Sequence, residues 1–95
     1  MDYNPGVRIP HNAITGKEYR AGNIDRLLAA TEEMGYDPER GWATLRQWRS
    51  IGRRVKMYEK GTNIFYVGDS PSENGATTKY GKRFVVFHMD QTKED

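Results

Sequence analysis

Residues 40–66 read RGWATLRQWRSIGRRVKMYEKGTNIFY, and this stretch decides the fold because its hydrophobic period changes part-way along. Its first half has helical spacing, and Thr44 followed by Gln47 is a capping-box pattern. Three apolar residues recur on one side of this short helix: Leu45, Trp48 and Ile51. After Gly52, which we expect to end the helix, apolar and polar residues alternate as in a strand. A helix and strands this close together indicate a mixed α+β domain.

Further strands are expected on both sides of a polar segment. The pattern predicts strands over residues 54–58, 63–67 and 83–89, with a turn at 59–61. Residues 69–79 are rich in Ser, Gly, Asn and Thr, which predicts a mobile loop. The last two strands should therefore pair as an antiparallel hairpin near the C-terminus.

A longer helix is expected upstream of this stretch. Asn23 is a suitable N-cap, and Gly35 supplies a stop after a run of apolar residues at helical spacing. Residues 1–23 are rich in Gly, Pro and Asn, which predicts irregular structure with a turn at residues 15–17. The fold class is thus α+β, with two helices packed on a small antiparallel sheet of about three to five strands.

The composition fits one soluble domain over residues 1–95, with flexible ends at 1–11 and 90–95. Charged residues make up 29% of the chain, and no apolar run approaches the ~20 residues of a membrane helix. The first residues have no apolar signal-peptide core, and the absence of cysteine excludes disulfides and a thiol nucleophile. We therefore expect a cytoplasmic protein that does not bind a membrane.

Signatures of catalysis are few. His11 and His88 are the only histidines, and neither has metal-site spacing around it. No serine occupies a Gly-x-Ser-x-Gly elbow, and no glycine-rich phosphate loop occurs. We expect a non-enzymatic protein without a metal or cofactor, and we expect His88 at the surface or edge of a strand.

Charge is distributed unevenly along the chain. The net charge is only +2, yet residues 40–60 carry seven basic side chains and one acidic one, Glu59. Acidic residues gather before this segment and at the tail, so the segment should carry a positive field. Single-stranded nucleic acid needs cations for its phosphates and flat rings on which bases stack. Aromatic residues are interleaved here, and the apolar positions of Trp48 and Phe65 favour the core for those two.

Several stretches, taken in order, resemble one known family. They are NAITGKEYRAGN at 12–23, GWATLRQW at 41–48, GRRVK at 52–56, EKGTNI at 59–64 and FVVFHMDQT at 84–92. Their order and spacing resemble the N-terminal domain of ArdC-type antirestriction proteins and TraC-type plasmid primases. The resemblance implies a sequence-tolerant single-stranded DNA-binding domain encoded on plasmids, phages or other mobile elements. It does not extend to the zinc metalloprotease-like domain that follows in the antirestriction proteins.

The chain departs from the family pattern at a few positions. Met57 and Tyr58 stand where the family usually has Lys-Gly, which removes one cation and adds an aromatic ring. Ala13 replaces a proline, Ala21 is an added residue, and His88 stands where asparagine is usual.

Pattern and resemblance together predict a nucleic-acid-binding surface made of cations for phosphates and aromatic rings for bases. The predicted residues are Lys17, Arg20, Trp42, Arg46, Arg49, Arg53, Arg54, Lys56, Tyr58, Lys60 and Tyr66. The partner expected first is single-stranded DNA, with RNA as a related ligand. Two alternatives stay open. One is a small inhibitor or adaptor that binds a host protein, and the other is a winged helix that reads duplex DNA.

Overall fold

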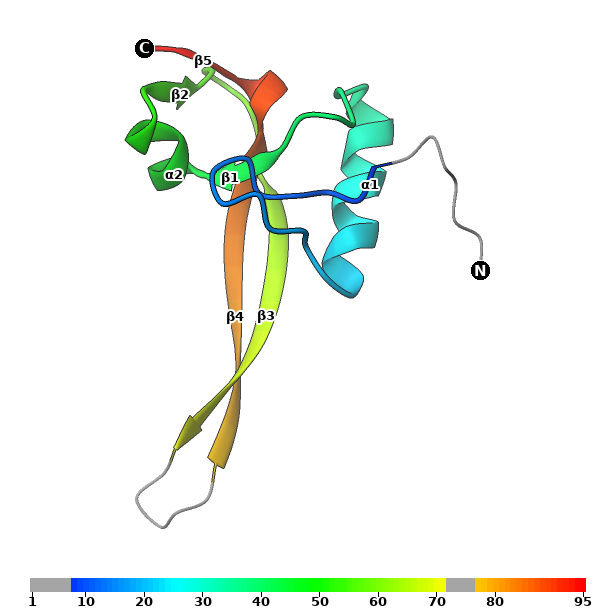
Figure 1. Ribbon diagram of the computed structural model, residues 1–95, viewed down its shortest axis with the longest axis vertical. Helices are drawn as coiled ribbons and strands as arrows, with labels where there is room; N and C mark the ends of the chain where they lie inside the picture. Colours follow the sequence, from blue (N-terminus) through cyan, green and yellow to red (C-terminus); the bar gives the residue numbers. More distant parts are fainter. Residues whose placement is uncertain (1–7, 72–76) are drawn as a thin grey trace.

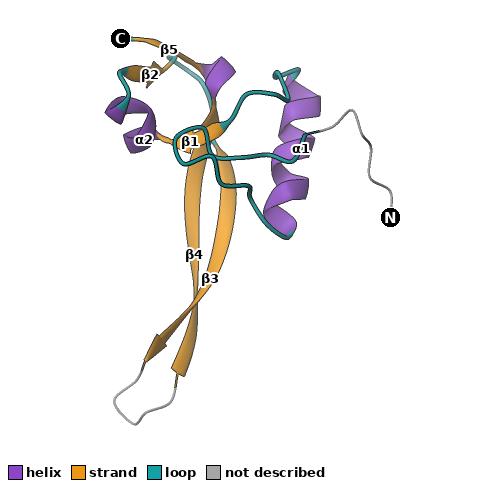
Figure 2. Cartoon of the chain, viewed as in Figure 1, coloured by secondary structure: helices purple, strands orange, loops and turns teal. Residues whose placement is uncertain are grey.

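The computed structural model describes residues 8–71 and 77–95, which form an α+β fold (Figures 1 and 2). Its elements in chain order are α1 (Gly22–Met34), β1 (Trp42–Thr44), α2 (Leu45–Ser50), β2 (Arg53–Val55), β3 (Thr62–Pro71), β4 (Thr77–His88), the 3-10 helix η1 (Met89–Gln91) and β5 (Thr92–Glu94). The strands form an antiparallel sheet in the order β1-β4-β3 and a second pair, β2-β5. The predicted fold class is confirmed, including a hairpin towards the C-terminus.

Strands β3 and β4 are longer than predicted. Their pairing runs from Thr62 opposite Val86 to Pro71 opposite Thr77. Much of the predicted loop over residues 69–79 is therefore strand, and the rest of it, 72–76, lies outside the described residues. On the β4 side, Thr77 and Thr78 favour extended backbone, although the polar composition suggested a loop. The paired strands extend away from both helices, as Figure 1 shows.

The tail of the chain is ordered rather than frayed. Residues 92–94 pair with β2, and Gln91 is buried with its side-chain amide donating to the carbonyl of Lys60. The predicted flexible segment 1–11 also includes an ordered part, because His11 forms an isolated bridge with Glu18. These contacts join residues far apart in the sequence, so a prediction from local polar composition does not find them.

Helix α1 ends as predicted but begins differently. Gly35 adopts the left-handed conformation with φ of 71° and caps the helix. Asn23 is not the N-cap. It lies inside the helix, where its amide donates to the carbonyl of Phe65 and its side-chain oxygen accepts from that residue's N–H, both at 2.9 Å. Asn23 thereby satisfies the backbone N–H and carbonyl of Phe65 at the outer edge of β3, and it fixes the start of α1 beside that strand.

Helix α2 has the predicted capping box between Thr44 and Gln47. The predicted apolar stripe is wrong apart from Trp48, which is fully buried and donates its indole N–H to the carbonyl of Phe87. Leu45 and Ile51 are 42% and 51% exposed, since a helix of six residues reaches the sheet through one large side chain.

The strand predicted over residues 54–58 ends at Val55. Met57 and Tyr58 form a turn, and Tyr58 has a positive φ of 67°. Positive φ is uncommon outside glycine and does not belong to a strand. The departure from the family's Lys-Gly pattern thus places an exposed tyrosine at a position that suits glycine.

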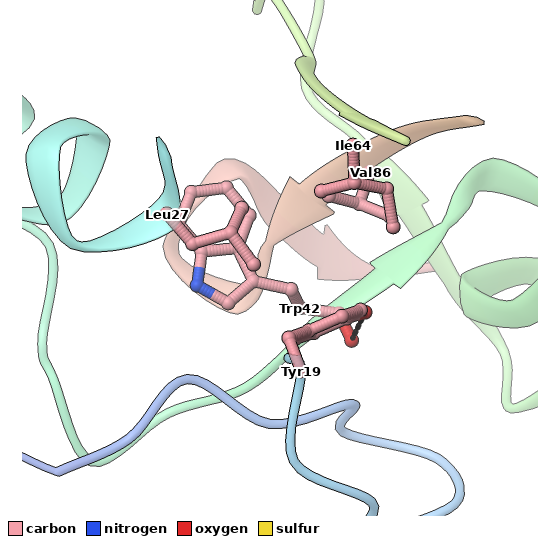
Figure 3. Close-up of a cluster of buried hydrophobic side chains, with 5 residues drawn as sticks. All are labelled: Tyr19, Leu27, Trp42, Ile64 and Val86. Atoms are coloured by element: carbon pink, nitrogen blue, oxygen red, sulfur yellow. Dashed lines mark hydrogen bonds between the residues drawn. The ribbon is translucent and has the colours of Figure 1, made fainter. Parts of the chain in front are cut away.

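The core lies between α1 and one face of the larger sheet. Figure 3 shows the buried cluster of Tyr19, Leu27, Trp42, Ile64 and Val86. The prediction that Phe65 belongs to the core is wrong, because its neighbour Ile64 takes the inward position and side chains alternate along a strand. The prediction that His88 lies at the surface is also wrong, since the residue is fully buried with its ring stacked on Tyr36.

Candidate nucleic-acid interface

A groove of about 990 Å³ lies between residues 15–21 and strand β3. Its lining residues are Asn12, Thr15, Lys17, Glu18, Tyr19, Arg20, Ala21, Asn23, Phe65 and Tyr66. Three of the predicted binding residues meet here: Lys17, Arg20 and Tyr66. The sequence separates the first two from Tyr66 by more than forty positions, and the fold brings them to one concave surface.

Asn12 holds the loop that carries the two cations. Its side-chain oxygen accepts the N–H groups of Ile14 and Thr15 at 2.8 and 3.0 Å, which makes a tight turn. Its amide donates to Gln47 at 3.0 Å and to the Tyr19 hydroxyl at 3.3 Å. The loop is therefore fastened both to the capping box of α2 and to the core, so Lys17 and Arg20 project from a fixed frame.

The hairpin contributes an aromatic surface to the same groove. Tyr66 is 46% exposed and meets Phe84 edge to face, with ring centroids 5.4 Å apart. The ammonium of Lys82 lies 5.1 Å from the centroid of the Phe84 ring, and Lys82 pairs directly with Tyr66 across the strands. Aromatic and cationic side chains thus continue from the groove along the hairpin face, where both bases and phosphates can be met.

Lys82 and Phe84 belong to this candidate interface, although no prediction from the sequence named them. The available signal was the alternation of the last strand, which puts Lys82, Phe84 and Val86 on one face. Without the register between β3 and β4, nothing indicated that this face also carries Tyr66.

A second missed pair lies at the edge of β3. The guanidinium carbon of Arg26 in α1 lies 4.6 Å from the centroid of the Phe65 ring, a cation–π contact. Phe65 is 45% exposed and lines the groove. Arg26 therefore adds a positive charge to the side of the groove formed by α1 and β3.

The remaining predicted residues lie on other surfaces. Arg46 and Arg49 are exposed on α2. Arg53 donates to the Thr92 hydroxyl at 2.8 Å, and Arg54 lies 3.8 Å from the Asp95 carboxylate. Beyond β2, an exposed loop carries the other predicted residues: Lys56, Tyr58 and Lys60. The fold therefore divides the predicted surface into three regions instead of joining it.

Trp42 requires a correction. The prediction that it stacks on bases is wrong, because its side chain is 1% exposed in the centre of the core. It packs edge on against Tyr36 and His88, with centroid distances of 5.9 and 5.1 Å. A ring enclosed in this way has no free face on which a base could stack. Trp42 instead packs in the core with Tyr19, which lines the groove.

The predicted positive field over residues 40–60 is partly cancelled in three dimensions. Asp90 comes from the acidic tail, and its carboxylate lies 3.0 Å from the Arg40 guanidinium. Asp95 lies beside Arg54 in the same way. Among the side chains described in 8–66 and 81–95, no carboxylate lies within 4.0 Å of the cationic groups of Lys17, Arg20 or Lys82. The groove keeps its positive charge while the predicted segment loses part of its own.

Comparison with known proteins agrees with this arrangement of motifs. Residues 2–94 match the family described as the N-terminal domain of anti-restriction factor ArdC. The chain belongs to this family. The predicted family is therefore confirmed over nearly the whole length of this ArdC N-terminal domain.

Two curated relatives share the domain. DNA primase TraC of Escherichia coli is 34% identical over 89 residues, which cover 94% of this chain and 8% of TraC. The uncharacterized protein y4eC of Sinorhizobium fredii is 27% identical over 97 residues, which cover 90% of this chain and 31% of y4eC. This ArdC N-terminal domain thus spans less than a third of the length of either protein.

A solved structure supports the fold directly. The antirestriction protein ArdC from plasmid R388, in its metal-free form, superposes with a TM-score of 0.77 at 30% identity over 92% of this chain and 33% of that protein. Its Mn(II)-bound form superposes with a TM-score of 0.76 at 30% identity, over 90% and 35%.

Several motifs that carry the resemblance to ArdC form the scaffold of the domain. Asn12 and Gln47 fasten the groove loop to α2. Gln91 accepts the N–H of His88 and donates to Glu59 and to the carbonyl of Lys60. A side chain that makes these internal bonds has little capacity left for a ligand. The motif residues thus specify the frame on which the groove is built.

Two buried groups of the domain have altered acidity. Burial raises the pKa of the Tyr19 hydroxyl to about 12. Burial also lowers the pKa of His88, although the nearby Asp90 carboxylate acts in the opposite direction. The Nδ1 atom of His88 accepts from the N–H of Asp90, so its Nε2 donates to the carbonyl of Asp37. His88 is therefore a neutral, structural imidazole.

No group of three or more His, Cys, Asp or Glu side chains in the described ranges is arranged to hold a metal ion. Among the same residues, no helix is long and apolar enough to cross a membrane.

Proposed function

We propose that this ArdC N-terminal domain is a non-catalytic module that binds single-stranded DNA with little sequence preference. It serves a plasmid, phage or other mobile element in antirestriction or DNA transfer. The observation that carries the proposal is the groove where Lys17, Arg20 and the half-exposed Tyr66 meet. A single strand needs cations that bind its phosphates and an exposed aromatic ring on which a base can stack.

The neighbouring residues support the same partner. Lys82 and Phe84 extend the surface along the hairpin, and Arg26 lies over Phe65 at its edge. The names of the relatives agree with a role in DNA handling, since they include a DNA primase and an antirestriction protein. As part of the proposal, the domain acts in the bacterial cytoplasm, where plasmid strands are transferred and copied.

The test is a titration of a labelled single strand of about 20 nucleotides with the protein, followed by fluorescence anisotropy. We expect binding at low salt that weakens steeply as salt is raised. Tyr66→Ala should weaken binding by about 1–3 kcal/mol because one base loses its platform. Tyr58→Ala is the matched control, since Tyr58 is 93% exposed but lies outside the groove.

Three outcomes would count against the proposal. If the labelled single strand does not bind even at low salt, the proposed single-strand-binding function is excluded. Preference for duplex over single strands in competition would favour a winged-helix mode of binding. Equal losses in Tyr58→Ala and Tyr66→Ala would move the site away from the groove.

A second candidate function is binding of a host protein. It is favoured by Met57 and Tyr58, which are 79% and 93% exposed at the tip of a turn. Large exposed apolar side chains of this kind occur at protein interfaces. A pulldown from nuclease-treated bacterial lysate separates the two candidates, because a partner bridged by nucleic acid would be lost. Retention by wild type and loss in a Met57→Ala/Tyr58→Ala variant would support the adaptor.

A further inference from the structure

Several polar side chains of the groove are already used inside the protein. Asn12 bonds to its own turn, to Gln47 and to Tyr19, and Asn23 bonds twice to the backbone of Phe65. The Thr15 hydroxyl accepts the N–H of Lys17 at 3.2 Å. These groups shape the groove and leave little capacity for a ligand.

Glu18 is the only carboxylate among the lining residues of the groove. Its side chain is exposed and follows Lys17 directly, yet in residues 8–66 and 81–95, whose side chains the structure describes, no cation lies within 4.0 Å of its carboxylate. A free carboxylate repels phosphate, so in a groove for nucleic acid its position is unfavourable unless it faces a hydrogen-bond donor. On a single strand of DNA, the hydrogen-bond donors are the N–H groups at the edges of the bases.

Base edges differ in the donors that they offer. Cytosine, adenine and guanine carry exocyclic amino groups, whereas thymine has no amino group and offers only a ring N3–H that lies between two carbonyl oxygens, which repel a carboxylate. A carboxylate accepts well from an amino group such as that of cytosine. A base stacked on Tyr66 would lie in the same groove that Glu18 lines.

We propose that Glu18 reads the amino group of the base bound in this groove, so that the domain favours amino-bearing bases over thymine. The inference rests on the proposed single-strand function and adds a limited base preference to it. Lys17 and Arg20 hold the phosphates, Tyr66 holds the ring, and Glu18 selects its edge.

The experiment compares two labelled strands of equal length at neutral pH, one of thymine alone and one that alternates thymine with cytosine. Wild type should bind the alternating strand about tenfold more tightly, the low end of the effect of one hydrogen bond to a charged group. Glu18→Ala should abolish the preference and bind the thymine strand as well as wild type or better. Glu18→Gln keeps an acceptor oxygen and should retain part of the preference. Glu32→Ala removes an exposed carboxylate outside the groove and should change nothing.

The other results overturn the inference in different ways. Equal binding of both strands by wild type excludes base reading and leaves the single-strand function standing. A preference that survives in Glu18→Ala means that stacking, not Glu18, selects the base. Tighter binding of both strands by Glu18→Ala in equal measure means that the carboxylate only repels phosphate. If wild type binds neither strand, the proposed function itself fails.

Discussion

The side chain of Gln91 joins the end of β4 to the loop that precedes β3. Its oxygen accepts the N–H of His88 at 2.9 Å, and its amide donates to the carbonyl of Lys60 at 2.7 Å. The residue is 2% exposed, so water cannot replace these bonds when the side chain is removed. A buried N–H and a buried carbonyl without partners each cost about 1–3 kcal/mol.

Gln91→Leu should therefore lower the free energy of unfolding by about 2–4 kcal/mol, measured by urea denaturation. Lys93→Ala is the control. It alters an exposed side chain two positions away and should change stability by less than about 0.5 kcal/mol. A Gln91→Leu variant as stable as the control would mean that the loop at Lys60 does not depend on this amide.

At the scale of single residues, the sequence predicted interactions between near neighbours and failed for distant ones. The bond between Thr44 and Gln47 spans three positions and was predicted from its spacing. The predicted locations of Trp42 and Phe65 are reversed: Trp42 is buried and Phe65 is exposed. Which face of a strand is buried depends on the helix that packs against it. No pattern in the sequence points to Glu18, since only the assembled groove brings it to the same surface as Tyr66.

At the scale of elements, Gly61 sets how closely the start of β3 approaches β4. A methyl group placed on Gly61 would lie only 2.2 Å from Cγ1 of Val85 and 3.0 Å from the ring of Phe87. Neither group is the free end of a long side chain, so the strands would have to move apart. Overpacking of this kind costs about 1–3 kcal/mol.

Gly61→Ala should accordingly reduce the free energy of unfolding by about 1–3 kcal/mol in urea denaturation. Gly81→Ala is the matched control on the same hairpin, because a methyl group placed there would meet no atom within 4 Å. Neither glycine nor alanine strongly favours a β-strand, so the exchange itself should change strand stability little. Similar effects in the two variants would mean that backbone freedom, rather than contact with Val85, is what glycine provides.

The elements themselves show which signals the sequence carries. Two local signals were predicted correctly, the left-handed Gly35 that ends α1 and the capping box of α2, whereas the predicted N-cap Asn23 lies inside α1. Long-range pairing was not, because the partner of β5 is β2, nearly forty residues earlier. The hairpin was predicted but too short, since its polar ends resemble a loop in composition, although Thr77 and Thr78 favour a strand.

At the scale of the whole molecule, stability should depend on pH through the buried histidine. His88 has a lowered pKa in the folded protein because burial disfavours its charged form, while its ordinary value in the unfolded chain is 6.5. The unfolded chain therefore binds the proton more readily, and acid favours unfolding. The contribution of His88 to stability is fully present above pH 6.5 and is lost as the pH falls below it. The lowered pKa of His11 acts with the same sign.

Urea denaturation of wild type across this pH range should show stability that rises with pH. His88→Asn should flatten that slope, because asparagine can accept the N–H of Asp90 without taking up a proton. The slope is the quantity to compare, since the variant also loses the stacking on Tyr36. An unchanged slope would assign the acid sensitivity to other groups.

The distribution of charge over the whole molecule gives the sharpest comparison between binding surfaces. The groove holds Lys17 and Arg20, and α2 holds Arg46 and Arg49, all exposed. A single strand releases about 0.7 counterions for each phosphate that a protein cation neutralises. The two groove cations together with Lys82 on the hairpin predict a slope of about −2 for the logarithm of affinity against the logarithm of salt concentration.

Lys17→Ala/Arg20→Ala should reduce that slope to about −0.7, whereas Arg46→Ala/Arg49→Ala should leave it near −2. Each double variant lowers the net charge by the same amount, so a general loss of electrostatic attraction affects both alike. A difference in slope between them therefore reports direct phosphate contact. If the α2 pair alone reduces the slope, the strand lies on the helix that the charge pattern of the sequence favours. Equal reductions in both would mean that it crosses from the groove onto α2.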